Sequence, residues 1–458
     1  MSIQVSTVPE TAAGALKASS DHRYTYLATL LSQRPALETP AFKPDVAALL
    51  QELRDRATAQ AHELAIPSTR EEEWRFTDLS PLLQTSFQAT TACVSFPDVV
   101  DWMLPEAARS RVVFVSGIYA PHVSAIANLP PGAIVGNLAS LSLSEPQLAR
   151  IRACLGQQPG AEEVFTALNT ASLTDVAVVW IPKNQVLEVP IHLVFLSDAQ
   201  ETATISQPRC LVILESGSSV TLVEKYAALT PNAGVYFSNA VTEIWLEENA
   251  QLNHTRVQED GSNAFHIGKT AIAQARSSRY TCNAISLGAK LSRHNLEVLQ
   301  TGEQTETTLN GLTRIRDDQV SDTHSAIAYT KPYGKSRQLH KCIIDDQARA
   351  VFNGKVSVPK PAQLTDAGQL NRNILLSPKA RVDTKPQLEI TADNVKCSHG
   401  ATVSQLDAEE VFYLQSRGLD QASAQKLLID AFALEIINQI PVPSLQNKLA
   451  DHVEIQKL

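Results

Sequence analysis

The spacing of hydrophobic residues divides the chain into three parts. Within residues 1–174 the apolar positions mostly recur at helical steps of three and four. Within residues 175–405 they fall into short runs with the two-residue alternation of β-strands, and the helical spacing returns over residues 406–458. We therefore expect a mostly helical N-terminal region, a β-rich core and a C-terminal helical domain.

The N-terminal region contains one clear amphipathic helix, over residues 43–64. Pro44 suits its first turn, where a backbone N–H has no partner within the helix. The apolar stripe of this helix comprises Val46, Leu49, Leu50, Leu53, Ala57 and Leu64. We expect further helices near residues 23–33 and within 146–172, and a buried strand over 111–118.

Residues 175–405 favour a β-solenoid. Short strands rich in Val, Ile, Leu and Thr follow small or polar turn residues, as after Gly217, Gly288 and Gly400, and no amphipathic helix interrupts them. The turns are irregularly spaced, so the sequence shows no strict repeat. A β-sandwich is the alternative, but one of this size would more readily split in two, and no Pro/Gly-rich linker divides the stretch. The end strands of a solenoid would offer edges for pairing with a partner.

The C-terminal region predicts two helices and a final short one within residues 444–458. Asp407 and Glu410 resemble a capping box for a helix that ends at Gly418, and Asp420 caps a longer helix. The apolar band of the longer helix is wider than one packing face requires, and it comprises Leu427, Leu428, Ala431, Phe432, Leu434, Ile436, Ile437 and Ile440. Such a band predicts either a lid on the solenoid or a docking face for another protein, and the pattern leaves both open.

Composition narrows the function classes. The 458 residues are 44% hydrophobic and 19% charged, with a formal net charge of −9. No basic stripe with interleaved aromatic residues indicates nucleic-acid binding. No apolar run reaches the roughly 20 residues that cross a bilayer, and residues 1–20 lack the pattern of a secretory signal. The six cysteines are far apart, with no CxxC spacing, which is typical of a reducing compartment. We expect a cytoplasmic protein.

Candidate metal chemistry is concentrated in one short strand that runs into a glycine turn. Cys397 and His399 are two residues apart, so both side chains lie on the same face of the strand. Thiolate and imidazole are ligands for iron, zinc or copper, but a tetrahedral site needs about four, so a second strand or chain would have to complete it. The alternative is a buried cysteine beside a histidine that caps the turn. A second same-face pair, His340 and Cys342, is better interpreted as core packing.

The segment over residues 67–78 combines aromatic and charged residues. Ser68 or Thr69 can cap a short helix, with acidic residues in its first turn. We interpret Trp74 as an anchor to a core. A substrate platform built on Trp74 and Arg75 is the functional alternative.

Several motifs resemble the SufD family, whose members are subunits of the SufBCD iron–sulfur cluster assembly complex. The most specific is the stretch over residues 382–402, which contains the Lys-Cys-Ser-His-Gly sequence of residues 396–400. The other matching segments are residues 67–78, 350–355, 369–376 and 412–418.

The resemblance implies a right-handed parallel β-helix between N- and C-terminal helical regions. It implies a non-catalytic scaffold that pairs with SufB through the β-helix end and binds the ATPase SufC through residues 407–458. It also implies that Cys397 and His399 lie at the SufB interface and bind iron or a nascent iron–sulfur cluster transiently, shared with the partner. Without SufB, the isolated chain could pair with itself through the same end.

Two other functions compete with the scaffold. Many parallel β-helices act on polysaccharides, and the carboxylate pairs Asp317–Asp318 and Asp345–Asp346 invite that comparison. Adjacent residues of a strand point to opposite faces, however, so turns are the expected location of these pairs. An accessory role in ATPase-driven membrane transport is the other alternative. The chain itself lacks the G-x-x-x-x-G-K-[ST] loop that binds ATP phosphates.

Overall fold

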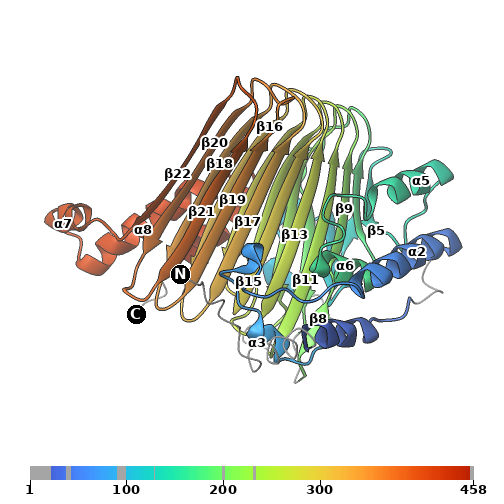
Figure 1. Ribbon diagram of the computed structural model, residues 1–458, viewed down its shortest axis with the longest axis horizontal. Coiled ribbons are helices and arrows are strands. Elements are labelled where there is room, and N and C mark those ends of the chain that lie inside the picture. Colours follow the sequence, from blue (N-terminus) through green and yellow to red (C-terminus); the bar gives the residue numbers. More distant parts are fainter. Residues whose placement is uncertain are drawn as a thin grey trace, which may run out of the picture.

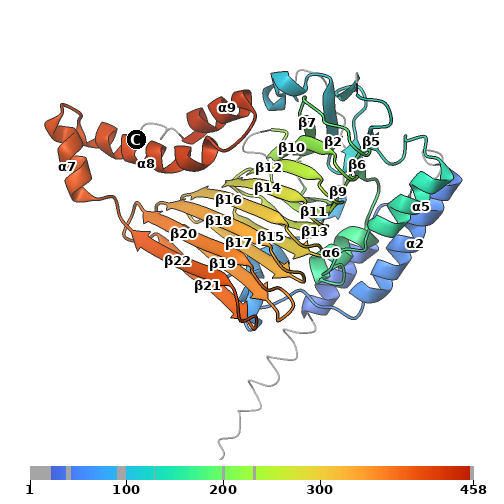
Figure 2. The same cartoon turned by 90° about the horizontal axis from the view of Figure 1, so that it is seen from above.

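Two large β-sheets face each other and run the length of the molecule (Figure 1, Figure 2). The computed structural model describes residues 22–37, 43–89, 99–127, 129–198, 202–230 and 234–453. Each sheet has eleven strands, and along the chain successive strands alternate between the sheets from β9 to β22.

Sheet A contains β5 (Ile134–Asn137), β6 (Ala177–Ile181), β9 (Arg209–Leu214), β11 (Tyr236–Leu246), β13 (Phe265–Gln274), β15 (Leu291–Gln300), β17 (Val320–Tyr329), β19 (Arg349–Val358) and β21 (Arg381–Ile390) in that order, with β8 (Thr204–Ser206) beside β11 and β1 (Gln88–Ala89) beside β8. Sheet B contains β3 (Ile118–Tyr119), β2 (Ser110–Val115), β7 (Ile191–Ser197), β10 (Ser219–Ala228), β12 (Gln251–Glu259), β14 (Arg279–Leu287), β16 (Glu306–Ile315), β18 (Lys335–Ile344), β20 (Asp366–Leu375) and β22 (Lys396–Ser404), with β4 (Ala125–Ile126) beside β2.

The strands stack parallel and in register, which confirms the predicted β-solenoid. In sheet B, for example, the successive partners in one row are Gln251, Arg279, Glu306, Lys335, Asp366 and Lys396. The connections between strands differ in length, so an even structural stack produces no strict sequence repeat. The carboxylate pairs Asp317–Asp318 and Asp345–Asp346 lie in the connections that follow β16 and β18, as expected.

The main core fills the space between the sheets. Alternate residues of each strand point inward, so rows of aliphatic side chains run along the solenoid axis. In sheet A one such row is Ile244, Ile272, Val298, Ile327, Val356 and Leu388, which are all buried except the half-buried Leu388 on the last strand. Burial of these rows is the main favourable term for stacking the coils.

The predicted N-terminal helices cover the outer face of sheet A. Residues 22–32 form a helix, followed by α2 (Pro44–Ala61), α3 (Ser80–Leu83), α5 (Glu145–Cys154) and α6 (Val164–Ala171). The stripe predicted on α2 is buried: Leu49, Leu50 and Leu53 pack with Val178 and Leu211 of the sheet.

The strand predicted near 111–118 is the fully buried β2, which pairs parallel with β7. Residues before 175 therefore contribute strands to both sheets. Antiparallel pairing of β3 and β4 with β2, and of β5 with β6, closes the first end of the solenoid.

Three helices form the C-terminal region: α7 (Ala408–Ser416), α8 (Gln421–Ile437) and α9 (Pro443–Val453). Asp407 and Asp420 cap α7 and α8 as predicted, each through its carboxylate and a backbone N–H. Helices α8 and α9 lie along the outer face of sheet B, while α7 projects beyond it (Figure 2).

The apolar band of α8 is buried toward its C-terminal end and more exposed toward its N-terminal end. Ile429, Ala433, Ile436 and Ile437 are buried against outer-face residues of sheet B. Leu427, nearer the N-terminus of the helix, has 48% of its surface exposed. Within the band, Ile436, Ile437 and Ile440 therefore fasten α8 to the solenoid, Leu428, Phe432 and Leu434 are half-buried, and Leu427 and Ala431 are exposed.

This division predicts different effects for two truncations on α8. Ile436→Ala should lower the free energy of unfolding by about 2–5 kcal/mol, because it leaves a cavity in a buried contact. Leu427→Ala should change it by less than about 1 kcal/mol. Denaturant titrations followed by circular dichroism would test this, and equal losses in both variants would contradict the assignment of faces.

Candidate metal-ligand site at the open end of the solenoid

Cys397 and His399 lie on β22, the last strand of sheet B. Strand β22 pairs with β20 alone, so one of its edges has no neighbouring strand. Cys397 is opposite Ala367 and His399 is opposite Gln369. The predicted pair is thus at the C-terminal end of the stack, where no further coil covers it within the described residues.

Both side chains belong to the inward-facing set of β22. Cys397 packs against the main core, and two-residue alternation puts His399 on the same face. Gly400 faces the other way: a Cβ added there would lie 3.3 Å from Cδ1 of Leu370, an outward-facing residue that is 40% exposed. Cys397 is half-buried and His399 is exposed. The thiol and imidazole therefore sit at the mouth of the space between the sheets.

The thiol of Cys397 is protonated at neutral pH. Burial raises its pKa, the nearby Asp366 carboxylate raises it further, and the Ala367 backbone N–H partly offsets the rise. A metal ion that binds the sulfur must displace this proton, and the positive charge of the metal favours that loss. Binding here would accordingly strengthen as the pH rises.

The other described cysteines are unsuitable as accessible ligands, because Cys154, Cys210, Cys282 and Cys342 are all buried. Cys93 lies outside the described residues. Across the described part of the chain, no three His, Cys, Asp or Glu side chains are arranged to hold a metal ion.

His340 and Cys342 occupy the core, as predicted. They lie on β18, and the His340 ring stacks on Phe352 with 5.0 Å between ring centroids. Burial lowers the pKa of His340 to about 4 and raises the pKa of Cys342 to about 12, so both groups are neutral at pH 7. In register, His340 is opposite Asn371 rather than Gln369, so this pair is not in line with His399.

The interior also holds an ion pair that the sequence pattern did not reveal. Glu224 and His254 are fully buried between the sheets, with 3.3 Å between Oε2 and Nε2. Burial by itself would lower the pKa of His254, but the Glu224 carboxylate raises it to about 9, so the pair is charged. Period-two alternation identifies these positions as inward-facing, but it cannot show that their charges meet across neighbouring coils.

The segment over residues 67–78 lies across the outer face of sheet A, at the same end of the solenoid. It includes a short 3-10 helix, η2 (Glu72–Trp74). Trp74 is buried, with its ring centroid 5.5 Å from that of Phe165 and 3.9 Å from the Arg293 guanidinium carbon. These contacts confirm that Trp74 is a packing anchor.

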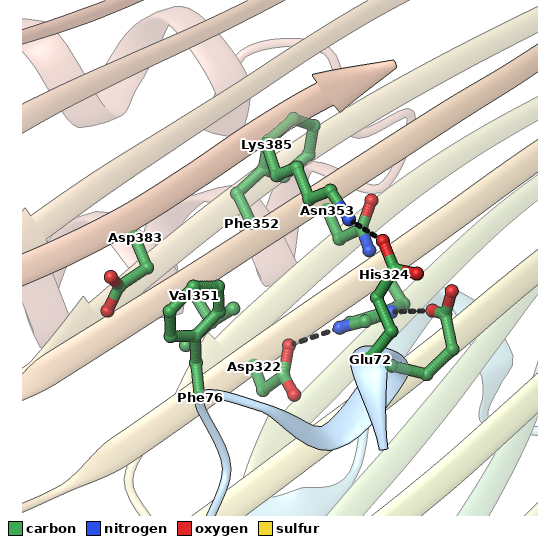
Figure 3. A pocket seen from close by; sticks show the side chains of 10 residues that line it. Glu72, Phe76, Asp322, His324, Val351, Phe352, Asn353, Asp383 and Lys385 are labelled. Carbon is green, nitrogen blue, oxygen red and sulfur yellow. Dashed lines mark hydrogen bonds and ion pairs between the residues drawn. The ribbon is translucent and has the colours of Figure 1, made fainter. Parts of the chain in front are cut away.

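A small polar cavity lies between this segment and strands β17, β19 and β21 (Figure 3). Its lining comprises Glu72, Glu73, Phe76, Asp322, His324, Val351, Phe352, Asn353, Asp383 and Lys385. Lys385 of β21 pairs with Glu72, so the segment also contacts the last strand of sheet A.

His324 joins the segment to the sheet. Its Nδ1 is 3.1 Å from Oε2 of Glu73, and its Nε2 is 3.0 Å from Oδ1 of Asp322. Burial alone would lower the pKa of His324, but these two carboxylates raise it. The neighbouring Arg293, 2.6 Å from Oδ2 of Asp322, helps to lower the pKa of Asp322 to about 2. We call this set of paired charges, which consists of Glu73, His324, Asp322 and Arg293, the clasp. It contains no free nucleophile.

The clasp predicts a pH-dependent contribution to stability. Because the folded pKa of His324 is raised, its contribution is complete below about pH 6.5 and is lost as the pH rises through the folded value. The pKa of Glu73 is lowered, chiefly by its hydrogen bond to His324, so its contribution is present above about pH 4.5 and is lost on acidification. The melting-temperature difference between the wild type and His324→Gln should therefore be largest near pH 5.5 and smaller at pH 8. A difference that is independent of pH would contradict this.

The fold defines the class of protein: a parallel β-solenoid with one end closed by antiparallel strands and the other left open beside a thiol and an imidazole. Two family models match in succession. The SufBD protein N-terminal region matches residues 36–193, and the SufBD core domain of SUF system FeS cluster assembly matches residues 195–432. The chain belongs to the SufBD family.

Curated relatives agree along most of the chain. The SufBD family protein slr0076 of Synechocystis, named for iron–sulfur cluster assembly, is 50% identical over 86% of this chain and 88% of its own length. The chloroplastic protein ABCI7 of Arabidopsis thaliana is 33% identical over 88% of this chain and 86% of its own. The iron–sulfur cluster assembly protein SufD of Escherichia coli is 31% identical over 84% and 88%, respectively.

Family membership supports a role in iron–sulfur cluster assembly, and hence involvement with iron or clusters. It is consistent with a non-catalytic component. None of the described helices has the length and apolar character needed to span a membrane.

Proposed function

We propose that this protein is a SufD-type scaffold subunit of the SUF machinery. It pairs with a SufB subunit through the open end of the solenoid, binds the ATPase SufC through its C-terminal helices, and contributes ligands to iron or a nascent cluster at the SufB interface. The observation that carries the proposal is the position of Cys397 and His399 on the last strand of the stack, at its accessible mouth.

The open end supports pairing with a related solenoid. Strands β21 and β22 are the terminal strands of their sheets, and each has an edge without a strand partner in the described chain. Such edges pair readily with another chain through backbone hydrogen bonds. A partner solenoid would extend both sheets and bring its own ligands over the thiol and imidazole. In its absence, a second copy of this chain offers similar edges, so we also propose that the isolated protein can form a homodimer.

The ligand count supports a shared and transient site. Cys397 and His399 supply two of about four ligands, whereas stable clusters are usually held by four cysteines. Iron or a cluster is then cargo that binds when two subunits meet, and it can leave when they separate.

The proposed ligands can be tested in the complex co-expressed with SufB and SufC. We expect His399→Ala and Cys397→Ser each to lose most of the bound iron, because each removes one of about four ligands. Visible absorbance and iron analysis of the anaerobically purified complex measure the loss. Cys342→Ala is the matched control, since it removes a buried thiol from the same sheet. Full cluster loading in both ligand variants would exclude these residues from the mechanism.

The proposed SufC contact is the groove between α7 and α8. It is lined by Asp407, Glu409, Glu410, Tyr413, Leu414, Leu427, Leu428 and Ala431. On α7, Phe412 is 71% exposed and Tyr413 is 57% exposed. Exposed aromatic and aliphatic side chains around a groove are typical of a protein-binding surface. Because α8 is fastened to sheet B, movement of an ATPase bound here would be transmitted to the solenoid.

A charge in this groove should abolish ATPase binding without unfolding the chain. We expect Leu427→Asp to weaken the contact by about 2 kcal/mol or more, because it buries an unpaired carboxylate in an apolar interface. Val186→Asp is the control: Val186 is 64% exposed and lies in the connection between β6 and β7, where it bridges to Ser219. Co-purification with SufC measures binding, and circular dichroism checks the fold. Unchanged co-purification of Leu427→Asp would overturn this surface.

A further inference from the structure

Gln369 is the inward-facing residue directly below His399 in the stack. It lies on β20, and its Cα is the register partner of the His399 Cα on β22. Neighbouring strands are about 4.8 Å apart, so the two side chains are adjacent in one row of the interior. Only 4% of the Gln369 surface is exposed, whereas His399 lies at the mouth.

A hydrogen bond to the preceding strand of sheet B fixes the orientation of the Gln369 amide. Its Nε2 donates to Oε1 of Gln338 at 2.8 Å, and the Gln338 amide in turn donates to Oγ of Ser325 at 2.8 Å. With the NH₂ group committed to this chain of bonds, Oε1 of Gln369 is left as an acceptor. It is buried and accepts no hydrogen bond from any residue that the structure describes. A buried acceptor without a donor costs free energy, so a nearby donor would be stabilising.

The amide of Gln369 occupies space that a side chain at Gly354 would otherwise fill. A Cβ added at Gly354, on the facing strand β19, would collide with Nε2 of Gln369. Gly354 therefore has no side chain where the amide lies. Ser325, Gln338 and Gln369 form a chain of hydrogen-bonded polar side chains beneath the end of the solenoid.

We propose that Gln369 is the positioning residue for His399: its Oε1 accepts the N–H of the imidazole and fixes which ring nitrogen carries the proton. This inference rests on the proposed ligand role of His399, which it deepens. The register of β20 and β22 puts the two side chains in one interior row, so the proposed bond requires the exposed imidazole to rotate toward the acceptor. A neutral imidazole has one N–H and one free lone pair, so anchoring the N–H directs the other nitrogen toward the mouth. Histidine ligands are commonly held this way by a hydrogen bond from their second nitrogen.

The test compares the tautomer of His399 in the wild type and in Gln369→Met, which has a similar length but no acceptor. Nitrogen-15 shifts of the imidazole are recorded at pH 8.5 on the full chain, and His399→Ala assigns the signals. We expect one dominant tautomer in the wild type and, in Gln369→Met, a mixture matching the one that the exposed His62 gives in the same spectra. Gln274→Met, which alters an equally buried glutamine on β13, should leave the His399 signals unchanged.

Two further results bear on the inference. Gln338→Met should weaken the tautomer preference, because it frees the Gln369 amide to rotate. In the complex with SufB and SufC, Gln369→Met should retain about 10–100-fold less iron at limiting iron, as for other residues that orient a metal ligand.

Identical tautomer ratios in the wild type and Gln369→Met would overturn the positioning role, whatever His399 binds. Full iron loading of His399→Ala would instead remove the ligand role proposed for His399. In that case a tautomer shift in Gln369→Met would still demonstrate the hydrogen bond. The two failures are therefore distinguishable.

Discussion

In-register stacking of parallel strands is the constraint on which the rest of this structure depends. Each coil satisfies its backbone hydrogen bonds on the coils before and after it, so the strands from β9 to β20 are paired on both edges. At the first end, the antiparallel strands β3 and β4 pair with β2, and β5 pairs with β6. At the other end, β21 and β22 each have one edge without a strand partner among the described residues. The partner solenoid proposed above would add its strands at these two edges.

The flanking segments cover the outer faces of the sheets and leave that end open. Helices α2, α5 and α6 pack on sheet A, and α8 packs on sheet B. The clasp through Glu73 and His324 adds a polar fastening close to the last coils, since Lys385 of β21 pairs with Glu72. Rigid support close to the mouth would hold the two ligands that we propose, Cys397 and His399, in place.

Much of the architecture could be predicted because it depends on local periodicity. The stripe of α2, the caps Asp407 and Asp420, and the buried strand at β2 are all visible within short windows of sequence. The geometry of Cys397 and His399 was predictable for the same reason, since a two-residue spacing in a strand decides which face both side chains share. The shared face says nothing about depth, and only the stack shows Cys397 half-buried and His399 exposed.

Other features depend on residues brought together from distant positions. Glu73 and His324 are 251 residues apart in sequence, and Gln369 is opposite His399 only through the register of β20 and β22. The apolar band of α8 could not reveal which of its residues bury, because that depends on where sheet B ends. The sequence by itself determined the elements, their faces and the family motifs, since these follow from side-chain spacing within a few residues. Tertiary structure alone decided which strand is last, which residue lies beneath His399 and which charges pair, because those contacts are set by coil register across the stack.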